Sequence, residues 1–149
     1  MKQWLDAAID RGAVPVLTGQ NGDMDTIGSA IALAAIHPSL LACGLHLGRI
    51  AKRLVEEMEA PFRKIAAHGT VFPDQLGGII IVDAAAPNQV GIDLPEVPRL
   101  IIDHHATNGW ELRDGDFMMQ WDVRATTEMV ATYMFQHAKE ALTSPCLLY

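Results

Sequence analysis

Short apolar runs alternate along the chain with stretches in which apolar residues recur every three or four positions. The first pattern is typical of buried strands in a parallel sheet, and the second of amphipathic helices. We expect strands at residues 13–18, 40–46, 78–83, 100–103 and 117–121. We expect helices at residues 4–11, 26–35, 50–58 and 126–138. Strands that alternate with helices predict an α/β fold: a three-layer domain with a mainly parallel β-sheet flanked by helices.

Local signals refine this pattern. Four consecutive β-branched residues in the segment 78–83 (GIIIVD) make it the strongest strand signal. Pro15 conflicts with the first strand, because proline cannot donate a hydrogen bond to a sheet ladder. Thr126 or Thr127 can cap the last helix, with Glu128 in its first turn. The remaining segments carry weaker signals: no structure is assigned to 62–76, 84–98 is loop-like, and 106–125 is irregular apart from the short strand at 117–121.

Composition predicts one folded domain covering residues 1–149, because half of the residues are apolar and 19% are charged. A formal net charge of -7 without a basic run disfavours nucleic-acid binding by phosphate neutralisation. Cys43 and Cys146 lie far apart, so neither a disulfide nor a cysteine-ligated zinc site is expected. The polar N-terminus and the lack of a membrane-length apolar run predict a cytoplasmic protein with no membrane partner.

The chain ends on an apolar run at residues 145–149. Such an end is usually tied into a sheet or continued by more chain, so a truncated domain is one expectation.

The segment 99–105 (RLIIDHH) joins an apolar run directly to three polar groups. If this run is a buried parallel strand, Asp103, His104 and His105 stand at its carboxyl end, where α/β proteins usually place their sites. These three side chains can bind a metal or transfer a proton. The simpler interpretation is a helix-capping aspartate followed by two solvated histidines.

Three further aspartates have equivalent positions in the pattern. Asp23 and Asp25 follow the first strand, and Asp83 ends the strand at 78–83. Parallel strands would bring them all to one sheet edge, where clustered carboxylates raise each other's pKa unless cations are bound. Oxygen and imidazole ligands suit magnesium or manganese, with zinc or cobalt as alternatives. Two divalent ions against three aspartates leave a local charge of about +1, which attracts phosphate.

The Asp-x-Asp pattern at Asp23 and Asp25 is also typical of calcium loops and of phosphoryl-aspartate hydrolases. A calcium loop starting at Asn21 would need glycine where Thr26 stands and glutamate where Ala32 stands, so this loop type does not fit. A phosphoryl-aspartate hydrolase would need an apolar strand leading directly into the first aspartate; a four-residue polar turn intervenes, so this alternative stays open but is weaker. A helix-capping loop remains an alternative.

The residues, taken in order, resemble the DHH phosphoesterase family. Residues 23–29 (DMDTIGS) resemble its first motif and residues 81–83 (IVD) its second. Residues 103–105 (DHH) match the third motif, after which the family is named, and residues 125–128 (ATTE) resemble the opening of the following helix. The resemblance extends from about Val14 to Gln136. Each motif is weakly specific, whereas their ordered set is strongly specific.

The resemblance implies a two-metal phosphoesterase of the RecJ or oligoribonuclease type. Manganese is the typical metal, with Mg²⁺ or Co²⁺ as alternatives. Substrates in such a family include nucleotides, cyclic dinucleotides, short oligonucleotides and pyrophosphate, and an oligomer is compatible with it. The implied metal ligands are Asp83 bridging both ions, Asp23 on the first, and Asp25 and His104 on the second.

The resemblance also implies roles around the substrate. His105 would contact the phosphate or position the nucleophile, and Asp103 would orient the histidines. Gly28 and Ser29 would bind substrate at a helix N-terminus, where anions are favoured. Gly19 stands where the family's first motif has a metal-binding histidine. Two hypotheses therefore stay open: an active phosphoesterase, or a catalytically impaired nucleotide-binding or regulatory module.

Overall fold

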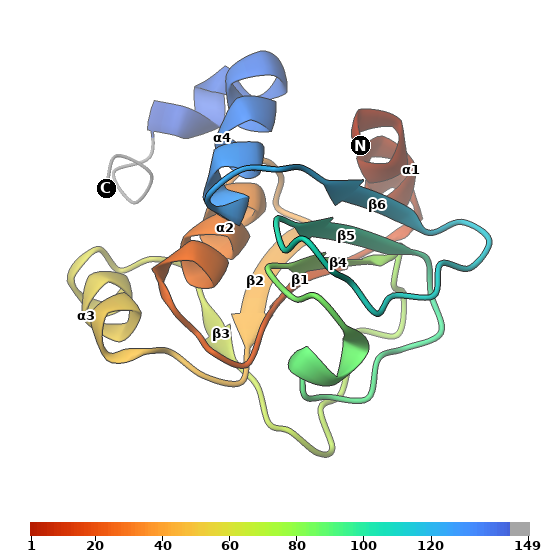
Figure 1. Cartoon of the computed structure of the whole chain (residues 1–149), viewed down its shortest axis with the longest axis horizontal. Coiled ribbons are helices and arrows are strands. Elements are labelled where there is room, and N and C mark those ends of the chain that lie inside the picture. The colour runs from red at the N-terminus through yellow and green to blue at the C-terminus, as the bar shows by residue number, and fades with distance from the viewer. Residues whose placement is uncertain (144–149) are drawn as a thin grey trace.

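The computed structural model describes residues 1–143 and shows a six-stranded sheet in which every strand pair is parallel (Figure 1). The spatial order is β3-β2-β1-β4-β5-β6. The strands are β1 (Val14–Thr18), β2 (Leu40–Gly44), β3 (Arg63–Lys64), β4 (Ile79–Val82), β5 (Arg99–Asp103) and β6 (Phe117–Gln120). The α/β class with a parallel sheet is confirmed. Strand β3 lies in the segment to which the sequence assigned no structure.

The helices occur where the apolar periodicity predicts them. They are α1 (Lys2–Arg11), α2 (Met24–Ala34), α3 (Arg49–Glu57) and α4 (Thr126–His137), with two short 3₁₀ helices, η1 (Pro87–Gln89) and η2 (Lys139–Thr143). None of the described helices is long and apolar enough to cross a membrane. The apolar run at 145–149 lies outside the described residues.

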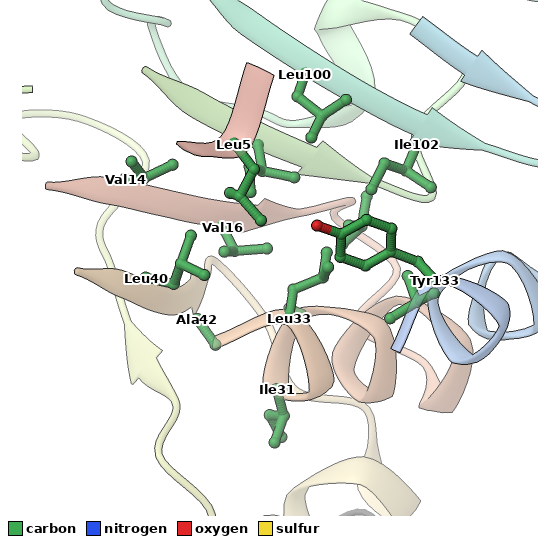
Figure 2. Close-up of a cluster of buried hydrophobic side chains, with 14 of the residues drawn as sticks. Leu5, Val14, Val16, Ile31, Leu33, Leu40, Ala42, Leu100, Ile102 and Tyr133 are labelled. Carbon is green, nitrogen blue, oxygen red and sulfur yellow. The ribbon is translucent and has the colours of Figure 1, made fainter. Parts of the chain in front are cut away.

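The α-helices share one face of the sheet. Buried side chains of β1, β2 and β5 pack there against Leu33 of α2 and Tyr133 of α4 (Figure 2). Leu5 of α1 and Ala51 of α3 belong to the same core cluster. The other face is covered mainly by loops, with η1 on that side of the sheet (Figure 1). Its core residues include Val90 and Trp110, which belong to these connections.

The position of Pro15 within β1 has a simple geometric reason. The preceding residue, Val14, donates its N–H to Ser39 on the β2 side. Since successive residues of a strand direct their backbone groups to opposite neighbours, the nitrogen of Pro15 faces the β4 side. On that side an isolated parallel bridge joins Ala13 to Leu76, and the pairing of β1 with β4 starts at Val16. Pro15 therefore lies in the gap between these two pairings, where a missing N–H is tolerated.

An ion pair attaches the loop before β6 to the start of β5. The guanidinium of Arg99 donates to Asp116 and, at 2.7 Å, to the backbone oxygen of Glu111. Asp116 also accepts the backbone N–H of Arg99 at 2.8 Å. Burial of Asp116 opposes its ionisation, but these bonds from Arg99 and one from Arg113 outweigh it and lower the pKa of Asp116. The attachment places β6 beside β5 and brings the following segment to the carboxyl end of the sheet.

Candidate metal centre

The predicted site residues gather where the strand order changes direction. From β1 the chain continues outward through β2 to β3, and it then returns to the other side of β1 for β4, β5 and β6. Ligands of open α/β sheets bind at the carboxyl ends of the strands at such a switch point. Asp23 follows β1, Asp83 follows β4, and Asp103 is the last residue of β5.

Asp83 is the central residue of this cluster. It is buried, with 5% of its surface exposed, and it adopts a left-handed backbone with φ of 56°. Among residues other than glycine, aspartate and asparagine tolerate this conformation best. Burial, and then the negative charges of Asp25 and Asp23, raise the pKa of Asp83 to about 6. A carboxylate held in such surroundings is a typical functional-site candidate, because a bound cation would relieve the cost of its ionisation.

The two histidines approach Asp83 from the end of β5. His104 Nε2 lies 3.5 Å from Asp83 Oδ1 and 3.8 Å from Asp25 Oδ2, and its Nδ1 lies 3.3 Å from the oxygen of Val123. His105 Nδ1 lies 4.0 Å from Asp83 Oδ1. Asp83, His104 and His105 each offer a ligand atom, and these atoms lie within 4.8 Å of one another. This donor set fits a divalent cation of the kind that binds oxygen and imidazole.

Asp103 is fully buried and holds His105. Its Oδ1 lies 2.7 Å from His105 Nδ1, whereas its Oδ2 has no hydrogen-bond partner among the described residues. The hydrogen bond to Asp103 is the main cause that raises the pKa of His105. Since Nδ1 is engaged, Nε2 is the atom of His105 that remains for a metal or a phosphate.

Asp23 and Asp25 lie beside the cluster, and each also accepts hydrogen bonds from the N-terminus of a helix. Asp23 caps α2, with its Oδ1 accepting the N–H groups of Asp25 at 3.0 Å and Thr26 at 3.1 Å. Asp25 accepts the N–H groups of Thr126 at 2.8 Å and Thr127 at 2.7 Å, at the start of α4. The prediction that Thr126 or Thr127 caps α4 is therefore wrong. Asp25 performs that role from α2, because its carboxylate reaches both free N–H groups.

Thr126 is the functional candidate that the sequence did not reveal. Its side chain is fully buried, and its Oγ1 donates to Asp83 Oδ1 at 3.2 Å while its backbone N–H donates to Asp25. One residue therefore contacts two predicted metal ligands. The sequence indicated only that the ATTE segment opens a helix. A buried threonine at the first helical turn carries no pattern that identifies its partner.

Gly28 and Ser29 lie in α2, after Asp23 and Asp25. Ser29 has no exposed surface, and its Oγ has no partner among the described residues. A Cβ at Gly28 would lie 3.5 Å from Thr127, so this glycine faces α4. At the start of α2, Asp23 accepts only the backbone N–H groups of Asp25 and Thr26, and the prediction that Gly28 and Ser29 bind substrate at this N-terminus stays a prediction.

Gly19 is held too tightly for a larger residue. It is buried, and its N–H donates to Thr26 Oγ1 at 3.1 Å. A Cβ at this position would lie 2.8 Å from the backbone oxygen of Asp83. The chain therefore lacks the histidine of the family's first motif, and the loop as folded also has no space for one.

Comparison with known proteins agrees with this geometry. The model of the DHH family, N-terminal domain, matches residues 13–148. The chain belongs to the DHH family. A comparison with curated proteins finds no match to the sequence.

Two solved structures show that the DHH fold of this chain recurs in longer proteins. One is a Methanococcus jannaschii protein described as a candidate family II inorganic pyrophosphatase, with 21% identity and a TM-score of 0.61 over 89% of this chain. The other is an exopolyphosphatase-related protein from Bacteroides fragilis, with 15% identity and a TM-score of 0.62 over 99% of this chain. This chain spans 42% and 46% of their respective lengths.

Proposed function

We propose that this chain is the catalytic domain of a metal-dependent phosphoesterase that hydrolyses phosphodiester or phosphomonoester bonds of nucleotides or short oligonucleotides. The observation that carries the proposal is the convergence of Asp83, His104 and His105 at the switch point of a DHH-family sheet. Family membership supports metal dependence and phosphoester chemistry, and the donor set supports Mn²⁺, Mg²⁺ or Co²⁺. Bound divalent ions would activate water and stabilise the leaving oxygen.

Each residue of the site would have its own role in metal and substrate binding. Asp83 would be a ligand of both ions, Asp23 of the first, and Asp25 and His104 of the second. His105, with Nδ1 held by Asp103, would contact the phosphate through Nε2. Thr126 fixes the orientation of the Asp83 carboxylate. The left-handed backbone at Asp83 directs this side chain from the end of β4, which is a conformation typical of functional sites.

A second candidate function is nucleotide binding without turnover. The tight packing of Gly19 against Asp83 favours it, because the family's histidine ligand has no replacement of equal strength in this loop. Gln20 and Asn21 offer only amide oxygens there. Under this alternative the chain would bind a nucleotide in a metal-dependent manner and would not hydrolyse it.

Hydrolysis of a chromogenic phosphodiester, with and without Mn²⁺, tests the first candidate against the second. We expect Mn²⁺-stimulated turnover that Asp83→Asn reduces by at least 10²-fold, since the central carboxylate is lost. Asp10→Asn is the matched control, because Asp10 is an exposed aspartate of α1. Metal-dependent nucleotide binding without hydrolysis would favour the binding module. Hydrolysis that is unchanged in Asp83→Asn would contradict the proposed site.

A further inference from the structure

The turn that carries Asp83 is held by residues outside the candidate metal centre. The N–H of Asp83 donates to the backbone oxygen of Ile102 at 2.9 Å, at the end of the pairing between β4 and β5. The chain then turns through the left-handed backbone of Asp83. A residue other than glycine keeps this conformation only where the surrounding structure determines it. The contacts of the next residues, 84–86, therefore influence where the Asp83 carboxylate lies.

Trp110 supplies one of these contacts from the loop that follows the two histidines. Its indole Nε1–H donates to the backbone oxygen of Ala84 at 2.8 Å, and its side chain is buried, with 7% of its surface exposed. The preceding residue, Gly109, donates its N–H to the backbone oxygen of Ala85 at 2.7 Å. Two hydrogen bonds therefore join the segment directly after Asp83 to the segment after the histidines.

The segment 84–86 is also held on its other sides. A Cβ at Gly109 would lie 3.3 Å from the Cβ of Ala86, so the two segments are closely packed. The N–H of Ala85 donates to Gln89 Oε1, in η1, at 2.6 Å. Residues 84–86 are thus fixed between η1 and the loop that carries Trp110.

Arg99 fixes Trp110 in turn. The guanidinium carbon of Arg99 lies 5.6 Å from the centroid of the indole ring, which is a cation–π distance, and its Nη2 donates to the backbone oxygen of Glu111 at 2.7 Å. A buried indole N–H usually has a hydrogen-bond partner, so the bond alone is ordinary. Its place is informative, because the acceptor belongs to Ala84, the residue directly after the central carboxylate of the site.

We propose that Trp110 is a positioning residue of the metal centre, and that its bond to Ala84 fixes the turn from which the Asp83 carboxylate faces the two histidines. This inference rests on the proposed function, since it concerns the proposed cation site. Trp110 would act on the site through the backbone. Residues that orient metal ligands in this indirect way commonly alter metal affinity.

Trp110→Phe tests this role, because it removes the indole N–H and keeps an aromatic ring. Trp4→Phe is the matched control: Trp4 Nε1 also donates to a backbone oxygen, that of Gly115 at 2.9 Å, but before β6, at the opposite end of the strands. Calorimetric titration of the full chain with Mn²⁺ is run at a temperature where circular dichroism shows every variant folded. We expect Trp110→Phe to weaken Mn²⁺ binding by about tenfold, and Trp4→Phe to bind Mn²⁺ as the wild type does. Both variants should melt at lower temperature, because each leaves a backbone carbonyl without its partner.

A second variant separates the hydrogen bond from the volume of the ring, because phenylalanine also leaves a small cavity. Trp110→3-benzothienylalanine, introduced at this one position, keeps the size of the ring system and has sulfur in place of the N–H. We expect it to weaken Mn²⁺ binding as strongly as Trp110→Phe does, and to fold even where the smaller side chain is not tolerated.

The outcomes separate this role from the proposed function. Mn²⁺ affinity that is unchanged in both Trp110 variants would overturn the positioning role and leave the proposed metal centre standing. Wild-type affinity in the benzothienylalanine variant alone would assign the effect to ring volume and would also overturn the role, as would equal weakening in Trp4→Phe. A wild-type chain that does not bind Mn²⁺ would overturn the proposed function together with the role of Trp110.

Discussion

At the scale of single residues, the buried charge of Asp83 lowers the stability of the metal-free chain. Its raised pKa of about 6, against an ordinary value of 3.8, means that the folded state binds its proton more strongly than the unfolded state. Stability should therefore fall as pH rises from about 4 to 6, and it should stay lower above that range. Functional groups that are buried in this way commonly trade stability for activity.

Asp83→Asn should therefore stabilise the metal-free chain at pH 7, by on the order of 1–3 kcal/mol, since it removes the buried charge. Asparagine tolerates the left-handed backbone and can still accept the Thr126 hydrogen bond, so the local structure is retained. Thermal melts in EDTA between pH 4 and 8 measure the effect. Asp10→Asn should keep the wild-type pH profile. A lower stability of Asp83→Asn at pH 7 would contradict the assignment of a destabilising charge.

At the scale of elements, the start of α4 is attached to the metal centre by Thr126. Thr126→Val should leave the backbone bond to Asp25 intact and remove the Oγ1 bond to Asp83. We expect Mn²⁺ binding to weaken by about tenfold, as with other partners of metal ligands. Calorimetric titration with Mn²⁺ measures this change.

Two variants make the Thr126 experiment specific. Thr126→Ser keeps the hydroxyl and should restore most of the affinity for Mn²⁺. Thr127→Val is the same substitution at the neighbouring position, where the backbone but not the side chain bonds to Asp25. Equal weakening in Thr126→Val and Thr127→Val would indicate a general disturbance of α4 and would argue against positioning by the Thr126 hydroxyl.

The elements also show how much of the fold and of the site could be predicted from the sequence alone. The ends of β4 and β5 were predictable because each is an apolar run that stops at an aspartate, and parallel strands must place such ends at one edge. The hydrogen bonds between Asp25 and α4 were not predictable, because they join residues 101 and 102 positions apart and leave no periodicity in the sequence. The bonds from Gln20 to the backbone oxygens of Asn88 and Gln89 were not predictable for the same reason, since both loops look like ordinary polar turns in the sequence.

At the scale of the whole molecule, helices cover one face of the sheet and mainly loops cover the other. The α-helices and the larger core cluster occupy one face of the sheet, whereas residues 84–98 and 106–116 cover much of the other. The proposed metal centre lies at the switch point of the sheet, and its proposed ligands stand at the start of α2 and directly after β4 and β5. Binding a cation there should stabilise the association of these elements as well as the site itself.

The melting temperature of the chain should therefore respond to metal. At a Mn²⁺ concentration of 100 times Kd, ligand linkage adds about 2.7 kcal/mol, which corresponds to a rise in Tm of roughly 5–10 °C for a domain of this size. The rise should shrink below pH 6, because protonation of Asp83 competes with the metal. EDTA should reverse the rise in Tm. The Asp83→Asn variant should show little rise with Mn²⁺, but in the absence of metal its Tm should be higher than that of the wild type. A wild-type Tm that Mn²⁺ does not change at pH 7.5 would show that the carboxylates and histidines, although gathered at one sheet edge, do not form a cation site.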